Sequence, residues 1–189
     1  GGVPVELAYK THTVLAGAGN ITFPAGIAAG DLIVFADLCR SNGSPIPTTP
    51  PSGFTLLVAT DTRYWSDDNH SGRIVIWYKV AEGTEGSMTH PGAKSTESQL
   101  PTTGKIVTVF SANAKSADHG GGVHNSDDFA STTFGAQSIS AGSGAAPLVV
   151  IGTWRSNAAH PNRSMSPAAD AEINAGDGLG YLKYKIYNS

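Results

Sequence analysis

The segment Asp61–His70 gathers two aromatic rings and several hydrogen-bonding groups in one short stretch, with Tyr64 and Trp65 adjacent. The hydrogen-bonding side chains that follow them are Asp67, Asp68, Asn69 and His70. Sugars bind to such sets, because an aromatic face stacks on the C–H surface of the ring while carboxylates and amides bind its hydroxyls; Tyr and Trp are also favoured anchors of protein interfaces. The segment therefore predicts a ligand or protein contact, and the alternative is that Trp65 folds back to cap the end of a sheet.

A second group of side chains that can bind ligands lies further along the chain. Its members are Asp118, His119, His124, Asp127 and Asp128. Carboxylates and imidazoles bind divalent cations, but this spacing matches neither a zinc motif nor an EF-hand loop. A solvated loop is therefore the main prediction and a metal site is the alternative, so no cofactor is expected.

Nothing in the sequence marks a catalytic constellation. The run His119–Gly122 is similar to the glycine-rich oxyanion segment of lipases and esterases, but that chemistry also needs a serine within Gly-x-Ser-x-Gly. The chain contains no such pentapeptide. Glycoside hydrolysis needs two facing carboxylates about 5 to 9 Å apart, and the spacing of the acids singles out no pair. We therefore expect no enzymatic activity.

The composition excludes several classes of protein. Charged residues make up 14% of the 189 residues and the net charge is −3, against about 25% charged in an average domain. Coiled coils need more charge and nucleic-acid binders need a basic surplus, so we expect no nucleic-acid partner. No run of apolar residues is long enough to span a bilayer, so we expect no membrane insertion. The only cysteine, Cys39, excludes an internal disulfide.

Short β-branched and aromatic runs, separated by Gly, Pro, Asn or Asp, predict an all-β chain. The predicted strands are Val3–Tyr9, Thr11–Ala16, Asn20–Phe23, Asp31–Leu38, Phe54–Thr60, Arg73–Val80, Lys105–Ser111, Thr132–Ile139, Leu148–Trp154 and Gly180–Tyr187. Ten short strands with polar turns favour one antiparallel β-sandwich, similar to a jelly roll, over residues 1–189. The start of the chain lacks both a Met and the features of a signal peptide, which predicts a processed or excerpted chain.

The apolar pattern predicts how some strands are buried. Arg73–Val80 alternates, so one face should lie in the core and the other should be partly wet. Leu32–Phe35 and Leu148–Ile151 are continuous apolar runs, which suit central strands covered on both faces. The stretch Gly180–Tyr187 alternates Tyr and Lys on one face, which is ordinary for a wet face or for a lysine-protected edge.

The two halves of the chain resemble each other, over about residues 20–81 and 136–187. Pro24–Phe35 aligns without gaps with Ser140–Ile151, and the tripeptide Arg-Ser-Asn follows both strands. Trp77–Val80 has a counterpart in Lys183–Ile186. The similarity predicts two pseudo-repeated units, and the alternative is the shared turn composition of sandwiches.

Three motifs carry a resemblance to a known family. Ile21–Leu32 contains P-A-G-x-x-x-G-D-L, Pro51–Leu57 reads P-x-G-[FW]-T-L-L, and Ile76–Ala81 is similar to Y-Y-K-V-A with Trp77 in place of the first Tyr. They resemble a β-sandwich module of virion proteins of tailed phages and gene-transfer particles, such as tail fibres, head fibres, spikes and decoration proteins. The motifs form turns into strands, so the resemblance implies a fold and a location but no active site.

We therefore expect a non-enzymatic structural protein on the virion surface, acting as capsid decoration or as a head or tail fibre or spike. Its expected partners are capsid or tail proteins, further copies of itself in a homo-oligomer, and host-surface polysaccharide. One alternative is a secreted bacterial carbohydrate-binding module with an aromatic platform that includes Trp65 or Trp77. The second alternative is a glycan hydrolase or lyase of sandwich fold.

Overall fold

The computed structural model describes residues 6–16, 21–41, 50–63, 71–88, 104–119, 147–154, 164–176 and 180–188. These residues form strands and turns, with no helix among them, which confirms the predicted all-β class. The strands are β1 (Ala8–Ala16), β2 (Ile21–Thr22), β3 (Leu32–Ser41), β4 (Thr55–Arg63), β5 (Ser71–Val80), β6 (Ser87–Met88), β7 (Gly104–Ser111), β8 (Leu148–Trp154), β9 (Ala171–Asn174) and β10 (Tyr181–Tyr187).

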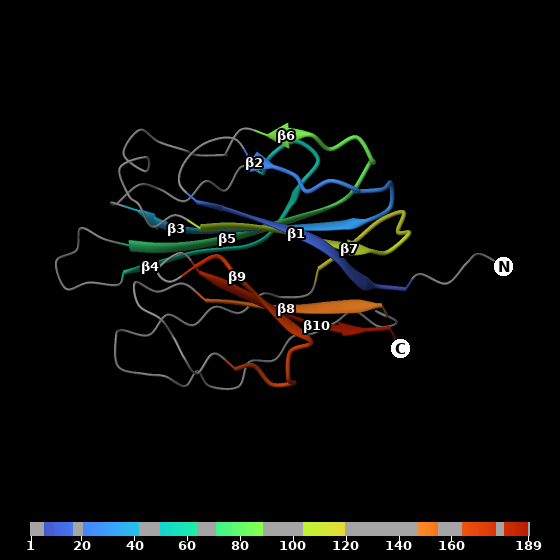
Figure 1. Cartoon of the computed structure of the whole chain (residues 1–189). Helices are drawn as coiled ribbons and strands as arrows, with labels where there is room; N and C mark the ends of the chain where they lie inside the picture. Colours follow the sequence, from blue (N-terminus) through green and yellow to red (C-terminus); the bar gives the residue numbers. More distant parts are fainter. Residues whose placement is uncertain are drawn as a thin grey trace.

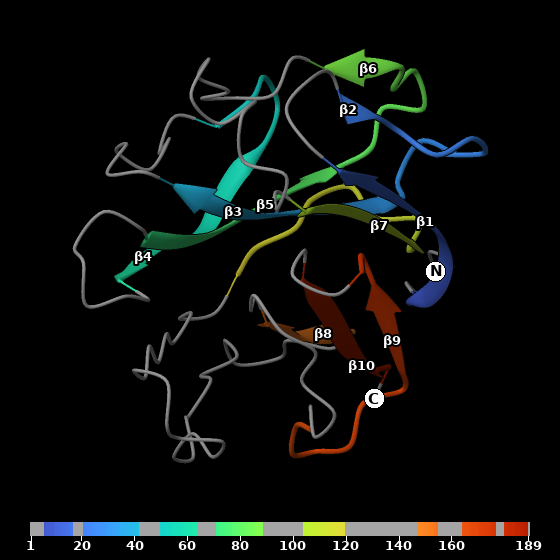
Figure 2. The ribbon, with the colours of Figure 1, turned by 60° about the vertical axis from the view of Figure 1, so that its left-hand side comes forward.

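The strands form three antiparallel sheets that lie in layers. A five-stranded sheet has the order β1-β7-β3-β5-β4, a three-stranded sheet has the order β8-β10-β9, and β2 pairs with β6. Figure 1 shows the five-stranded sheet in the middle, with the three-stranded sheet below it and the β2–β6 pair above it. The same layering is visible in the turned view of Figure 2. The two larger sheets form the predicted sandwich, and β2–β6 adds a small cover to its other side.

Strand β3 lies at the centre of the five-stranded sheet, between β5 and β7. Successive side chains point to opposite faces, and Ile33, Val34, Phe35 and Ala36 are all buried. Both faces of β3 are therefore covered, as its continuous apolar run predicts.

The inner face of the five-stranded sheet packs against the three-stranded sheet. Its core cluster joins side chains of β3, β5 and β7 to Ile173, Leu182 and Tyr184 from the smaller sheet. Tyr184 packs edge-on against Phe110, with ring centroids 5.3 Å apart, and stacks on Tyr9 of β1 at 5.7 Å. Such aromatic pairs stabilise by roughly 0.5–1.5 kcal/mol beyond the area that they bury, so this row of rings ties the two sheets together.

The outer face of the five-stranded sheet carries a second core cluster. Trp77 is fully buried there and stacks on Phe35, with ring centroids 5.2 Å apart. Ile21 of β2 and Phe54 of the turn before β4 cover this cluster. The prediction that one face of Arg73–Val80 is partly wet is therefore wrong for Val75 and Trp77, because the β2–β6 layer and the Phe54 turn shield them.

The pairing registers place the strand ends at two opposite ends of the sheet. Leu32 lies opposite Val80 and Phe110, whereas Ser41 lies opposite Ser71, which also faces Arg63. Near the Leu32 end, the Asn188 side-chain amide donates to the Leu7 carbonyl at 3.0 Å and accepts from the Leu7 N–H at 2.7 Å. We call this the terminal end, because the described chain enters and leaves there, and the Ser41 end the distal end.

Several strand predictions need correction. The two predicted strands Val3–Tyr9 and Thr11–Ala16 are one strand, β1, whose pairing with β7 shifts register between Tyr9 and Thr11. Strands β6 and β9 were not predicted, because two or four residues leave no period to detect. Thr132–Ile139 lies outside the described residues. Among the described strands, β8 stands at the outer position of its sheet and is half-buried, so its apolar run does not make it central there.

The internal similarity has a partial counterpart in the pairing. Strand β3 pairs with β5, and the corresponding strands β8 and β10 also pair. Leu32 lies opposite Val80, and the counterpart of Val80 is Ile186. Leu148, the counterpart of Leu32, lies opposite Tyr187 instead, one residue further along. A shift of one residue exchanges the faces of a strand, so the two pairs are not copies in register. The duplication stays a prediction.

Candidate functional site

The predicted contact segment is attached to the distal end of the sheet. Tyr64, Trp65, Asp67, Asp68, Asn69 and His70 all lie outside the described residues. The segment leaves β4 after Arg63 and enters β5 at Ser71, and these two residues are paired with each other. The strand register thus fixes where this loop is anchored, on the side of the fold away from the clasp between Leu7 and Asn188.

The predicted metal cluster is described at only two of its residues. Asp118 and His119 are exposed, and the Asp118 carboxylate accepts a hydrogen bond from the His119 backbone N–H at 2.8 Å. His124, Asp127 and Asp128 lie outside the described residues. In the part of the chain that the structure describes, no three His, Cys, Asp or Glu side chains gather as metal ligands would.

The His119 ring is bound to a buried tyrosine instead. Its Nδ1 lies 2.9 Å from the Tyr78 hydroxyl, and the two rings pack edge to face with centroids 5.5 Å apart. Burial raises the pKa of the Tyr78 hydroxyl, and the negative charge of Asp118 raises it further, against a hydrogen bond with Thr55 that lowers it. The phenol therefore stays protonated at neutral pH and fixes the segment that follows β7 against β5. A cation at Nδ1 would have to displace this hydrogen bond.

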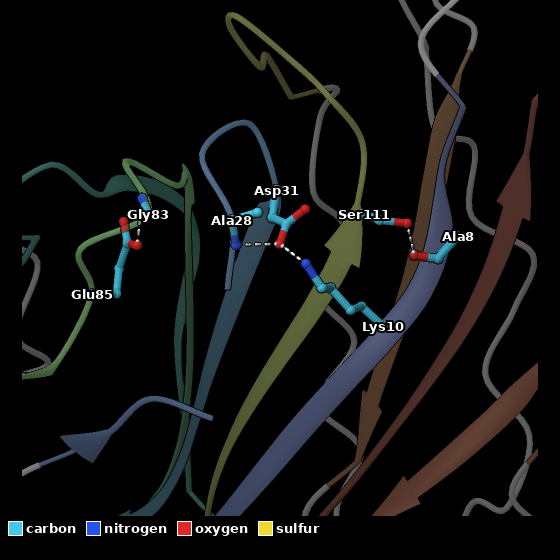
Figure 3. A network of polar contacts seen from close by, with 7 residues as sticks. All are labelled: Ala8, Lys10, Ala28, Asp31, Gly83, Glu85 and Ser111. Carbon is cyan, nitrogen blue, oxygen red and sulfur yellow. Dashed lines mark hydrogen bonds and ion pairs between the residues drawn. The ribbon is translucent and has the colours of Figure 1, made fainter. Parts of the chain in front are cut away.

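The first and third motif segments meet at the terminal end, where the Asp31 carbonyl accepts from the Ala81 N–H at 2.7 Å. The Asp31 side chain is 5% exposed, and its Oδ2 accepts from the Ala28 N–H at 2.8 Å and from the Lys10 ammonium at 2.6 Å (Figure 3). The Asp31 N–H in turn donates to the Ala28 carbonyl at 3.1 Å. These bonds close the turn into β3 and connect it to β1, so the Asp of the first motif has a structural role.

Gly30 lies where three chain segments meet. Its N–H donates to the carbonyl of Ala81 at 2.9 Å, and its carbonyl accepts from the N–H of Ala114 at 2.9 Å. Its φ is +89°, and a Cβ at this position would lie 3.1 Å from the Cα of Asn113. Glycine is required here both by the backbone conformation and by the close approach of the segment after β7.

A charged network lies beside this junction, over the turn that precedes β4. The Glu85 carboxylate accepts from the N–H of Glu82 at 2.7 Å and from that of Gly83 at 2.9 Å, and it pairs with Lys79 at 3.2 Å (Figure 3 shows the Gly83 contact). The Lys79 ammonium also lies 5.7 Å from the centre of the Phe54 ring. Burial alone would raise the pKa of Glu85, but these hydrogen bonds and Lys79 outweigh it and lower the pKa.

The low pKa of Glu85 makes a pH-dependent contribution to stability. A carboxylate whose folded pKa lies below its unfolded value of about 4.5 stabilises the fold above that pH, and the stabilisation disappears as the pH falls through the folded pKa. We expect Glu85→Gln to lower the free energy of unfolding by about 1–2 kcal/mol at pH 7, with a difference that shrinks steadily below pH 4.5. Urea denaturation followed by circular dichroism at several pH values measures this.

Glu82→Gln is the matched control for that experiment. The Glu82 carboxylate is 75% exposed and 3.9 Å from Lys79, so its loss should change stability by less than about 1 kcal/mol at any pH. Equal losses in the two variants, or a loss in Glu85→Gln that does not depend on pH, would contradict the role assigned to Glu85.

Asp37 and Lys105 were not singled out by the sequence. They lie directly opposite each other on β3 and β7, and both are buried. Directly opposed residues share one face of a sheet, so an acidic and a basic residue are neighbours on the buried outer face. The sequence indicates them only as isolated charged residues within largely apolar strands. A buried charge needs an opposite charge nearby, which makes this pair a structural feature of the outer core.

The described residues thus use their polar groups mainly to hold turns and strands together. Lys10, Asp31, Lys79 and Glu85 are all bonded within the fold. Trp77, a candidate for an aromatic platform, is fully buried and cannot stack on a ligand at the surface. A hollow beside Phe23 and Phe54 is open to solvent and has a volume of about 280 Å³.

Comparison with known proteins gave no match, whether with protein families, with curated sequences or with solved structures. Across the described ranges, the chain forms no helix of the length and apolar character needed to cross a membrane.

Proposed function

We propose that this protein is a non-enzymatic structural module on the surface of a phage or phage-like particle. It acts as capsid decoration or as part of a head or tail fibre or spike. In this role it contacts capsid or tail proteins and further copies of itself, and it binds host-surface polysaccharide through its distal end.

The observation that supports this proposal is that the three motifs form turns and strand pairs. Segments Ile21–Leu32, Pro51–Leu57 and Ile76–Ala81 resemble a virion sandwich module, and the hydrogen bonds of all three segments close turns or pair strands. Gly30 and Asp31 pair with Ala81, and a further backbone bond of 2.9 Å joins Phe54 to Pro51. Motifs that build turns support a scaffold function, because a catalytic motif would instead keep its reactive groups free for a substrate.

The arrangement of the two ends supports a displayed module. The hydrogen bonds between Leu7 and Asn188 hold the first and last described segments together at the terminal end. The segment that carries Tyr64 and Trp65 is attached to the opposite end. A module held at its terminal end would therefore present this segment outward, where weak contacts repeated over many copies gain roughly 10²–10⁴ in avidity.

Density-gradient sedimentation tests the proposed location. Particles released by cells that carry this gene are separated from free protein, and each fraction is probed with an antibody against the chain. We expect the chain to sediment with the particles and to stay with them at high salt, because a weakly charged surface forms few salt-sensitive contacts. A chain found only among free secreted proteins would contradict the virion proposal and favour a secreted carbohydrate-binding module.

A stacked pair of aromatic rings beside the hollow supports a secreted carbohydrate-binding module as the second candidate function. Phe23 and Phe54 stack with centroids 6.2 Å apart beside the open hollow. Aromatic rings at an open surface are the usual platform for sugars, and Trp77 cannot provide one because it is buried. A chain that stays monomeric and is not found on particles would favour this candidate, whereas an oligomer that assembles on a particle would favour the first.

A further inference from the structure

The open hollow lies between the β2–β6 pair and the turn before β4. Phe23 and Phe54 contribute aromatic side chains to its lining, and the hydroxyl-bearing residues Ser52, Thr84 and Ser87 also line it. Phe54 is buried, whereas Phe23 is half-buried, so Phe23 is the more accessible of the two residues. The hollow thus combines one aromatic surface with several small hydrogen-bonding groups.

The electrostatics of the hollow disfavour an anionic ligand. Lys79 is already held by Glu85 at 3.2 Å, lies over the Phe54 ring and has a side chain only 12% exposed. The Glu82 carboxylate is 75% exposed and is the charge that an incoming ligand meets. One cation and two carboxylates leave a local charge of −1, so a phosphate, sulfate or uronate would be repelled.

The size of the hollow restricts the ligand further. Its volume of about 280 Å³ lies just below the range of roughly 300–1,000 Å³ that is usual for small-molecule sites. It therefore has room for about one ring, and its open side allows a longer chain to continue past it.

We infer that this hollow binds one neutral pyranose unit of a polysaccharide, stacked on Phe23 and hydrogen-bonded to Glu82 and the surrounding hydroxyls. The inference rests on the glycan-binding part of the proposed function and adds a second site to it, distinct from the segment that carries Trp65. Because Lys79, Glu85 and Phe54 are fixed to one another, the wall of the site is in place before the sugar arrives, which limits the entropy lost on binding.

Nuclear magnetic resonance titration of the ¹⁵N-labelled full chain tests the site. The neutral probes are cellohexaose, maltohexaose, mannohexaose and chitohexaose, and the acidic probe is hexagalacturonate. We expect at least one neutral probe to shift the amide signals of Ser52, Thr84 and Ser87, and hexagalacturonate to bind at least tenfold more weakly. Absence of shifts at these amides with all four neutral probes, or tighter binding of the acidic probe, would overturn the inference.

Substitutions separate the hollow from the distal segment. Phe23→Leu removes the ring while keeping an apolar side chain and should weaken binding of the neutral probe about tenfold, whereas Trp65→Ala should leave the shifts at the hollow unchanged. Glu82→Arg, at a mostly exposed side chain, should preserve the fold even if Phe23→Leu does not, and should weaken binding of the neutral probe while strengthening that of hexagalacturonate.

The outcomes also distinguish this inference from the proposed function. If Trp65→Ala abolishes every glycan shift and Phe23→Leu changes none, the inference about the hollow is wrong and glycan binding by the distal segment stands. If the hollow binds sugar but the chain does not sediment with particles, the inference holds and the virion location is wrong.

Discussion

Trp77→Ala should lower the free energy of unfolding by about 3–5 kcal/mol, the largest effect that we expect from a single substitution in this protein. The indole is fully buried in the outer core, where it stacks on Phe35 beneath Ile21 and Phe54. Truncation would leave a void between the five-stranded sheet and the β2–β6 layer. Urea denaturation of both proteins, followed by far-ultraviolet circular dichroism, measures the difference.

Trp77→Phe is the matched control for the truncation. Among the described residues the indole Nε1 has no hydrogen-bond partner, so phenylalanine removes a buried polar group while filling part of the same space. We expect it to lose less than half of the stability that Trp77→Ala loses, because relieving an unsatisfied donor offsets part of the lost packing. A Trp77→Ala variant as stable as the wild type would show that this side chain is not in the core.

Gly30→Ala should destabilise the fold by about 2–4 kcal/mol. Two independent penalties combine at this position. The φ of +89° is unfavourable for any residue with a Cβ, and that Cβ would lie 3.1–3.2 Å from backbone atoms of Asn113 and Ala114. Because these neighbours are backbone atoms, they cannot rotate away, and the bond from Ala114 to Gly30 should weaken. Thermal and urea denaturation both report the loss.

Gly26→Ala separates the two penalties. Gly26 has a similar φ of +84°, but a Cβ there would meet no atom within 4 Å. Only the backbone strain applies, so we expect a loss of about 1–2 kcal/mol. If Gly26→Ala and Gly30→Ala were equally destabilising, the close packing of the segment after β7 against the motif turn would be unimportant, contrary to the structure.

The all-β class follows from the sequence, and a run of consecutive apolar residues predicts one buried central strand correctly. Leu32–Phe35 reads as a central strand and β3 is one. The same rule fails for Leu148–Ile151 among the described strands, because β8 is at the outer position of its sheet yet carries an equally apolar run. It also fails for the second face of Arg73–Val80. What covers Trp77 is the two-stranded layer: β2 lies within the predicted strand Asn20–Phe23, but β6 has only two residues, too few for a periodic signal.

The candidate sites were harder to predict, because their members are distant along the chain. The aromatic residues Tyr64 and Trp65 are easy to notice because they are adjacent in the sequence, whereas the hollow joins Phe23, Phe54 and Glu82 from three separate turns. Asp31 looked like a turn residue and is one, but its ion pair with Lys10 of β1 depends on the sheet order, in which only β7 separates β1 from β3. Such partners follow from sheet order, which local sequence patterns do not encode.

Cryo-electron microscopy of the released particles tests the central claim most directly. The map should contain density for this sandwich on the particle surface, with the clasp between Leu7 and Asn188 facing the particle body and the distal end, near Ser41 and Arg63, facing outward. Repeated copies should contact one another or a capsid or tail protein. A map of particles that carries no density for this fold, or one in which the distal end is buried against the body, would contradict the account.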